Sequence, residues 1–134
     1  MSFQRNNWKE KAGIQESNGW SYLPLNGKRL RKDSTFCSLR FQQEHFRNIS
    51  IDAPFQIEQG DGTLGSEEFT PDLTDYFINC IRGATIRYAR FDLRGQLEIA
   101  LDQESDLILR INIPDNASYG QHWSYNYSGG NISF

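Results

Sequence analysis

The chain has 134 residues, 23% of them charged, and a formal net charge of −3. This length suits one domain that buries a core without metals or disulfides. The charge balance excludes wholesale disorder and a surface built mainly to bind phosphates, so nucleic-acid binding would need a local basic patch.

The first 19 residues are polar, and several Asn and Gly residues break any regular period. They predict an extended or partly helical arm that Trp8 and Ile14 could pin to the rest of the domain. No apolar run is long enough to cross a bilayer, and the start lacks the basic and apolar stretches of a secretion signal. We therefore expect a cytoplasmic protein that does not bind membranes.

Residues 20–59 contain short segments rich in β-branched and aromatic residues, separated by Gly, Asp, Asn or Pro. Apolar residues alternate within them, so that Leu39 and Phe41 share one face of a strand, as do Ile49 and Ile51. This pattern is typical of strands with one buried face. We predict strands within residues 21–32, 35–41, 46–52 and 54–59.

The most concentrated charge in the chain is the basic run Lys28, Arg29, Arg31 and Lys32. We interpret it as an edge strand whose cations discourage aggregation. The alternative is a nucleic-acid surface, because aromatic residues that could stack on bases precede the run.

Residues 60–69 are rich in glycine and predict a loop, and a helix is predicted at about residues 70–82. Thr70 can cap this helix, Pro71 suits its first position and Gly83 follows its last turn. Four more strands are expected within residues 85–91, 96–101, 107–113 and 122–127, with a last short strand at 131–134. The predicted fold is mostly β, an antiparallel β-sandwich or flattened barrel with one short connecting helix.

The two halves of the chain can be aligned with each other. Segment 25–30 matches 81–86, segment 39–41 matches 97–99, segment 49–51 matches 109–111, and segment 54–62 matches 122–130. We predict one β domain at residues 20–134 after an arm at 1–19, with half-repeats at about 23–62 and 81–132 whose apolar faces pack together. The alternative is that any two β meanders share alternation and turn glycines.

The order of these segments, marked most clearly by Gly27, Gly83, Gly95 and Trp123, resembles a family of small bacterial two-repeat β proteins of unassigned function. The resemblance covers about residues 23–132 and departs from the family pattern in the turn DQESD and in the loop PDNASYG. It implies the fold alone, because the family has no established catalytic residues to carry over.

Sites for metals or catalysis are not apparent in the sequence. Cys37 and Cys80 are predicted to be two buried, reduced thiols, and His45 and His122 stand alone, so we expect no metal and no cofactor. The chain also lacks the Gly-x-Ser-x-Gly motif and any Cys-containing catalytic signature.

We therefore predict a non-catalytic binding protein, and most specifically a bacterial immunity protein that neutralises a partner toxin by surface docking. The predicted interface combines loop acids with an aromatic segment near the C-terminus. Its residues are Asp61, Glu67, Glu68, Asp102, Glu104, Asp106, Tyr119, His122, Trp123 and Tyr125.

Two alternatives remain open at this point. A small-ligand or nucleotide-binding β-barrel would hold its ligand beside His122, Trp123 and Tyr125. An enzyme of another type would use His122 or His45 as general base. Formation of a homo-oligomer through exposed edge strands is compatible with each of these hypotheses.

Overall fold

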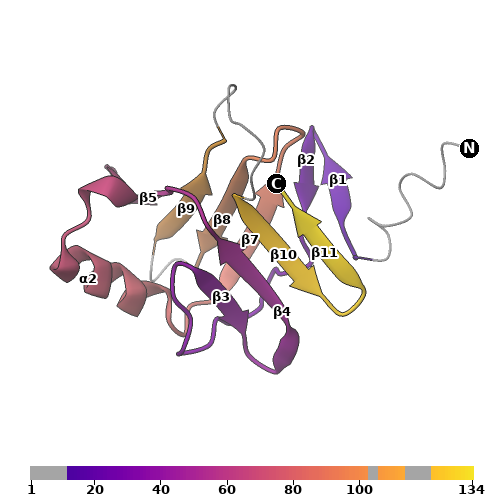
Figure 1. The fold of residues 1–134 in the computed structure, drawn as a ribbon, viewed down its shortest axis with the longest axis horizontal. Helices are drawn as coiled ribbons and strands as arrows, with labels where there is room; N and C mark the ends of the chain where they lie inside the picture. Colours follow the sequence, from indigo (N-terminus) through magenta and orange to yellow (C-terminus); the bar gives the residue numbers. More distant parts are fainter. Residues whose placement is uncertain (1–11, 103–105, 114–121) are drawn as a thin grey trace, which may run out of the picture.

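The computed structural model describes residues 12–102, 106–113 and 122–134, without the side chains of residues 45 and 46. All strand pairs in this part of the chain are antiparallel, and they form two separate sheets that pack face to face (Figure 1). The predicted sandwich with one connecting helix is confirmed, and neither sheet closes into a barrel.

The larger sheet has seven strands in the order β1-β2-β7-β8-β9-β5-β6, and the smaller has four in the order β11-β10-β4-β3. The elements of the larger sheet are β1 (Gln15–Ser17), β2 (Trp20–Tyr22), β5 (Gln56–Gln59), β6 (Gly62–Gly65), β7 (Ile86–Phe91), β8 (Leu97–Leu101) and β9 (Leu107–Ile111). Those of the smaller sheet are β3 (Ser38–Phe41), β4 (Glu44–Ile51), β10 (Trp123–Tyr127) and β11 (Gly130–Ser133). A 3-10 turn, η2 (Ser66–Glu68), and the helix α2 (Pro71–Ile81) connect β6 to β7.

The core lies between the sheets and is built by the alternation that the sequence shows. Ile49 and Tyr125 from the smaller sheet and Ile57 and Leu109 from the larger are all at most 2% exposed. Because one face of each sheet consists of such residues, a slip of one residue in any register would turn a whole apolar face toward water.

Helix α2 packs against the edge of the sandwich through an aromatic cluster. Its N-cap is Thr70, whose hydroxyl accepts a hydrogen bond from the Leu73 N–H (3.2 Å), with Pro71 at the first helical position. Phe36, Phe55, Phe69 and Phe77 form successive ring contacts with centroids 4.7–5.9 Å apart. These rings join the segment before β3, the start of β5 and the helix into one apolar unit.

The two halves of the chain occupy equivalent positions in the two sheets. Hairpin β5–β6 pairs with β9, whereas hairpin β10–β11 pairs with β4, so each half sends its second hairpin into the sheet of the other half. The registers match when 68 is added to the residue number: Ile57 pairs with Leu64, and Tyr125 pairs with Ile132. The same offset of 68 residues relates the aligned segments 54–62 and 122–130.

Hydrogen bonds between the halves repeat the same relation around a central bridge between Arg29 and Thr85. The Gly27 N–H donates to the Ile86 carbonyl (2.8 Å), and the Gly83 N–H donates to the Leu30 carbonyl (3.1 Å). Both glycines have a positive φ, +83° and +79°. The halves are therefore related by a pseudo-twofold axis near this bridge, while an origin by duplication stays a prediction.

One aligned segment needs a correction. Leu39 pairs with Ile49 in β3–β4, and Ile99 pairs with Leu109 in β8–β9. Given the equivalence of Ile49 and Leu109, Leu39 corresponds to Ile99 rather than to Leu97. The shift of two residues keeps both side chains on the core face, which is why the alternating pattern could not detect it.

Three predicted elements differ from the structure. Residues 62–65, predicted as part of a loop, form edge strand β6, and Gln15–Ser17 of the predicted arm form edge strand β1. Residues 23–37, predicted largely as strands, consist of turns and isolated bridges after β2 ends at Tyr22. The basic run in this segment is thus not an edge strand, because its neighbour Leu30 bridges to Phe41 and Arg29 bridges to Thr85.

Candidate binding surface

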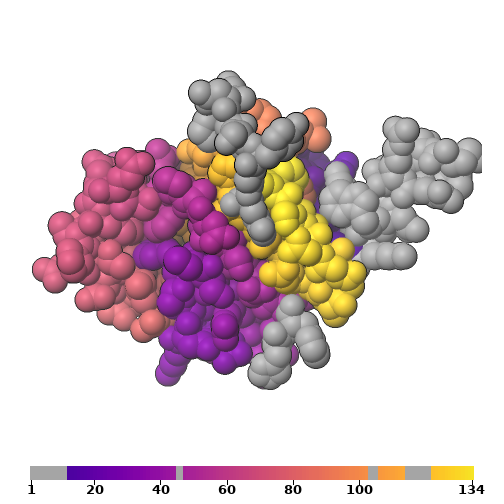
Figure 2. Space-filling view, in the orientation of Figure 1, coloured from indigo at the N-terminus to yellow at the C-terminus, as the bar shows by residue number. Residues whose placement is uncertain are grey.

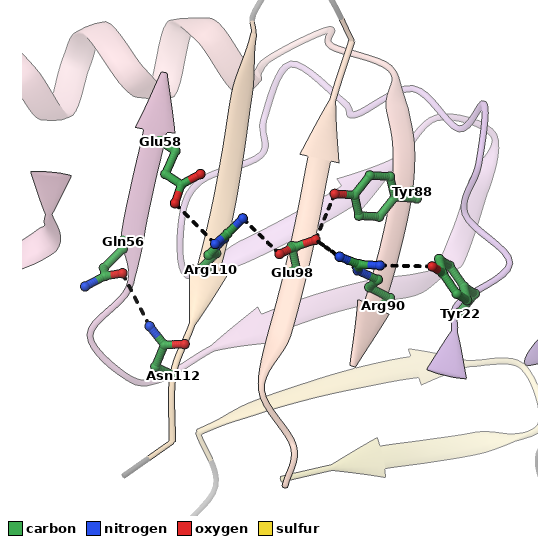
Figure 3. Close-up of polar contacts among 8 residues, drawn as sticks. All are labelled: Tyr22, Gln56, Glu58, Tyr88, Arg90, Glu98, Arg110 and Asn112. Carbon is green, nitrogen blue, oxygen red and sulfur yellow. Dashed lines mark hydrogen bonds and ion pairs between the residues drawn. The ribbon is translucent and has the colours of Figure 1, made fainter. Parts of the chain in front are cut away.

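A row of polar side chains crosses the outer face of the seven-stranded sheet. The register places Tyr22 opposite Arg90, Arg90 opposite Glu98, Glu98 opposite Arg110, and Arg110 opposite Gln56. The row therefore spans five adjacent strands, about 19 Å at the usual strand spacing. Figure 3 shows the side chains of Arg110, Glu98, Arg90 and Tyr22 directed toward one another along the sheet, while Gln56 contacts Asn112.

Glu98 is at the centre of the row, and its side chain is only 8% exposed. Its carboxylate accepts hydrogen bonds from the Tyr88 hydroxyl (2.8 Å) and from Arg90 Nε (2.9 Å). Ion pairs to Arg90 Nη2 (2.7 Å) and Arg110 Nη2 (3.0 Å) surround it further. A buried carboxylate is tolerated only when it is paired and hydrogen-bonded in this way.

The two arginines of the row are held on both sides. The Arg90 guanidinium lies 4.0 Å from the centre of the Trp20 ring and donates to the Tyr22 hydroxyl (3.0 Å). Arg110 pairs with Glu58 through Nη1 (3.2 Å) in addition to Glu98. Two carboxylates thus neutralise two guanidinium groups, and the row works as a rigid support for the sheet face.

The contacts around Glu98 shift the pKa values of Tyr88 and Arg90. Burial raises the pKa of Tyr88, and the hydrogen bond and negative charge of Glu98 add to the effect. Burial alone would lower the pKa of Arg90, but hydrogen bonds to Tyr22 and Glu98 outweigh it and raise the pKa. Arg90 therefore stays protonated, and Tyr88 stays neutral at physiological pH.

The row ends in a groove of about 540 Å³ between β9, β5, β6 and η2. Its lining residues are Pro54, Phe55, Gln56, Thr63, Gly65, Ser66, Glu67, Glu68, Arg110 and Asn112. Because Arg110 is already paired with Glu58 and Glu98, the carboxylates of Glu67 and Glu68 dominate the charge of the groove. Two amide side chains also line the groove, and Asn112 donates a hydrogen bond to Gln56 (3.3 Å).

Charge is distributed very unevenly along the chain. Residues 48–81 contain seven Asp and Glu residues and no Lys or Arg, whereas the rest of the chain has 14 basic side chains against ten carboxylates. Within it, residues 48–51 end β4, and residues 53–81 fold into β5, β6, η2 and α2, which form one end of the molecule, with α2 pink at the left in Figures 1 and 2. Net charge is therefore strongly negative at this end and positive over the remainder.

We use the name acidic surface for the exposed residues Asp61, Glu67, Glu68, Asp72, Asp75 and Tyr76. Tyr76 is 50% exposed, and its hydroxyl donates to Gln59 Oε1 (3.0 Å), which links α2 to β5. Asp72, Asp75 and Tyr76 project from the same side of α2 by their helical spacing. The acidic surface thus combines exposed carboxylates, which have no ion pair to another described residue, with an aromatic side chain of the type that anchors interfaces.

The predicted loop acids fall into two groups. Asp61, Glu67 and Glu68 belong to the acidic surface, and Glu68 also accepts a hydrogen bond from the Gly65 N–H (2.9 Å). Asp102 is half-buried and accepts from the Thr85 N–H (3.0 Å), while Asp106 is exposed in the β8–β9 turn. Since Gln59 pairs with Leu107, this turn lies beside the β5–β6 turn that carries Asp61.

The predicted aromatic residues have a different place. Trp123 and Tyr125 are completely buried, and Trp123 donates to the Gly95 carbonyl (2.6 Å) and contacts the rings of Phe91 and Phe134. They are core residues and are not presented to a partner. His122 is half-buried at the edge of this cluster, and Glu104 and Tyr119 lie outside the described residues.

Sequence reasoning missed several residues of the groove and of the acidic surface. Gln56, Arg110 and Asn112 are brought together only by the β5–β9 register, which no local pattern reveals. Tyr76 had a usable signal, because it lies off the apolar stripe formed by the buried helix residues Phe77 and Ile81.

The described residues contain neither a metal-binding cluster nor a membrane-spanning helix. In the described ranges, no three His, Cys, Asp or Glu side chains are grouped so that they could hold a metal ion. Within the same ranges, no helix has the length and apolar character needed to span a bilayer. Cys80 is half-buried but Cys37 is exposed, so the prediction of two buried thiols is wrong for Cys37, and the side chain of His45 lies outside the described residues.

Comparison of the chain with protein-family models, with curated proteins and with solved structures finds no match.

Proposed function

We propose that this chain is a non-catalytic binding protein that docks onto the basic surface of another protein through its acidic surface. The observation that carries the proposal is the stretch of residues 53–81, which contains six carboxylates and no Lys or Arg and is folded into one end of the molecule. Charge complementarity of this kind speeds diffusional encounter and selects among partners.

The surrounding structure supports binding in two ways. The acids of the polar row, Glu58 and Glu98, are engaged with arginines and stiffen the sheet beneath the groove. The carboxylates of the acidic surface are exposed, and two of them, Asp72 and Asp75, lie on the same side of α2 as the half-exposed Tyr76. A rigid frame that presents charges around an aromatic anchor needs little rearrangement to bind.

The more specific form of the proposal is an immunity protein that covers the basic cleft of a toxin domain. In that case Glu67 and Glu68 at the rim of the groove meet the Lys and Arg side chains with which such a cleft holds its own substrate. Neutralisation then requires only steric and electrostatic coverage by the immunity protein.

Affinity capture with matched charge variants tests the proposal. The double variant Glu67→Lys, Asp75→Lys reverses two charges on the acidic surface, and the control Glu16→Lys, Asp52→Lys reverses two exposed acids outside it. In capture from the native host, wild type and control should retain one stoichiometric basic protein, and the acidic-surface variant should lose it. A partner retained equally by both variants, or no stoichiometric partner at all, would refute the proposal.

The groove supports a second candidate function, the binding of a small ligand. Its volume of about 540 Å³ falls in the range usual for small-molecule sites, roughly 300–1,000 Å³. A metabolite retained by the purified protein and detected by native mass spectrometry, and lost in the variant Asn112→Leu, would favour this candidate over protein docking.

A further inference from the structure

Three arginines meet at a small hollow on the β3–β4 hairpin, away from the acidic surface. The hollow has a volume of about 160 Å³ and is lined entirely by polar side chains: Arg31, Arg40, Glu44, Arg47 and Asn48. Arg31 comes from the basic run, Arg40 from β3, and Arg47 from β4. The Arg31 N–H donates to the Arg40 carbonyl (2.8 Å), which fixes the basic run against β3.

Carboxylates neutralise this cluster only in part. Asp33 Oδ2 lies 3.0 Å from Arg31 Nη2 and 3.7 Å from Arg40 Nη1. Glu44 lies 3.2 Å from Arg47 Nε through its Oε2 and 2.7 Å from Lys28 Nζ through its Oε1. Among the residues that the structure describes here, Lys28 and the three arginines give four positive charges against the two carboxylates, an excess of +2 by formal count.

Arg40 has the most exposed side chain of the three arginines. Its side chain is 52% exposed, and its one ion pair within the described residues, to Asp33, is too long for a hydrogen bond. The main chain at this residue is nevertheless fixed, because the Arg40 N–H donates to the Ser34 hydroxyl (3.0 Å). The main chain of Arg40 is therefore fixed beside the hollow, and its guanidinium donates no hydrogen bond to the other described residues.

We propose that this hollow binds a phosphate group, with Arg31, Arg40 and Arg47 as its ligands. A volume of 160 Å³ equals about five water molecules at roughly 30 Å³ each, which is enough for one tetrahedral oxyanion. The planar fork of an arginine suits two oxygens of such a group, and three forks from separate segments surround it. Asp33 and Glu44 hold the arginines in place, and the excess positive charge attracts the anion.

The binding of inorganic phosphate, followed by NMR at constant ionic strength, tests this site. Sodium phosphate added in place of sodium chloride should shift the amide signals of Arg31, Arg40 and Asn48 in a saturable way. Arg40→Gln should weaken the binding about tenfold, the loss expected for one charge-assisted hydrogen bond. The control Arg29→Gln removes the same charge from an exposed arginine of the basic run that does not line the hollow, and it should bind like wild type.

A second arm of the experiment distinguishes the source of the phosphate. If O-phospho-L-serine binds at least as tightly as inorganic phosphate while L-serine does not bind, the site accepts a phosphate ester of a larger molecule. If only inorganic phosphate saturates the shifts, the ligand is the free ion, and the proposal also stands. Linear shifts without saturation, the same shifts with chloride, or equal weakening by Arg29→Gln and Arg40→Gln would overturn it.

Discussion

Glu98 is the one charged residue among the buried residues of the described chain, and its environment explains how that is possible. One tyrosine and two arginines satisfy its two oxygens, and those arginines have further partners in Trp20, Tyr22 and Glu58. Removal of the carboxylate would leave two guanidinium groups without their shared counter-ion on the sheet surface. Most of the lost stability would come from these two guanidinium groups, which lose their partner, rather than from the contacts of the removed side chain itself.

Glu98→Ala is therefore expected to lower the free energy of unfolding by about 3 kcal/mol, the lower end of the usual loss for a broken buried pair, because both arginines keep some solvent contact. The matched control is Glu58→Ala, which removes a carboxylate that is one-third exposed and, among the described residues, forms an ion pair with Arg110 alone. Its expected loss is at most about 1 kcal/mol. Urea unfolding of both variants measures the difference, and equal losses would show that the row is not organised around Glu98.

Two tyrosines make stability depend on pH in the alkaline range. Burial raises the pKa of Tyr88 and of Tyr125, so the folded state favours their neutral forms. Their contribution to stability is fully present below the unfolded-state pKa of about 10. It is lost as the pH rises through the higher folded-state pKa values, because the unfolded chain then releases protons more readily than the folded one.

The free energy of unfolding should consequently fall as the pH rises above about 10. The variants Tyr88→Phe and Tyr125→Phe should each make this fall shallower, and Tyr76→Phe at an exposed position serves as the control. Urea unfolding at a series of alkaline pH values provides the measurement. A slope that neither buried-tyrosine variant alters would contradict the assignment.

At the scale of elements, two turns near the pseudo-twofold axis require the same unusual backbone conformation. Gly27 and Gly83 both have a positive φ, and a Cβ atom at either position would meet nothing within 4 Å. Gly95 has a φ of +86°, but a Cβ atom there would lie 2.8 Å from Phe134 Cβ and closer still to its ring. The first two glycines are thus required for backbone conformation alone, and the third for conformation and space.

Gly27→Ala and Gly83→Ala should each lower the free energy of unfolding by about 1–2 kcal/mol, and the two losses should be similar. Gly95→Ala should cost more, since Phe134 and its contact with Trp123 must move as well. Gly65→Ala is the control, because Gly65 has an ordinary φ of −80°. Thermal unfolding of the four variants gives the comparison, and a clear inequality between Gly27→Ala and Gly83→Ala would contradict the equivalence of the two turns.

How far the sequence predicts each element depends on where its stabilising interactions come from. Helix α2 carries its own signals, Thr70 and Pro71 at one end and Gly83 beyond the other, and was predicted to within a residue. Strands β1 and β6 carry few apolar residues, because they are edge strands held mainly by backbone hydrogen bonds to β2 and β5. Backbone pairing leaves no trace in composition, so these two strands were missed.

The candidate site shows the same division between local and non-local information. The exposure of Glu67 and Glu68 follows from a polar turn that the sequence displays. Tyr125 and an exposed interface tyrosine look identical in sequence, because both belong to an alternating strand. Only the second sheet, which covers that face of β10, decides that Tyr125 is buried.

At the scale of the whole molecule, the two halves are interlocked rather than side by side. Hairpin β5–β6 of the first half finds its sheet neighbour in β9, and hairpin β10–β11 of the second half finds its neighbour in β4. Each sheet therefore contains strands from both halves, and the core forms only when both are present. Neither half can bury its apolar face with its own strands in this arrangement.

Cleavage between Glu68 and Phe69 should accordingly give two fragments that do not fold alone but fold together. Residues 1–68 contain β1 to β6, and residues 69–134 contain α2 and β7 to β11. Circular dichroism should show no cooperative thermal unfolding of either fragment and a cooperative transition for the equimolar mixture. Because folding is then coupled to association, the midpoint temperature should rise with concentration. A fragment that unfolds cooperatively as a monomer would show that its sheet does not need the strands of the other half.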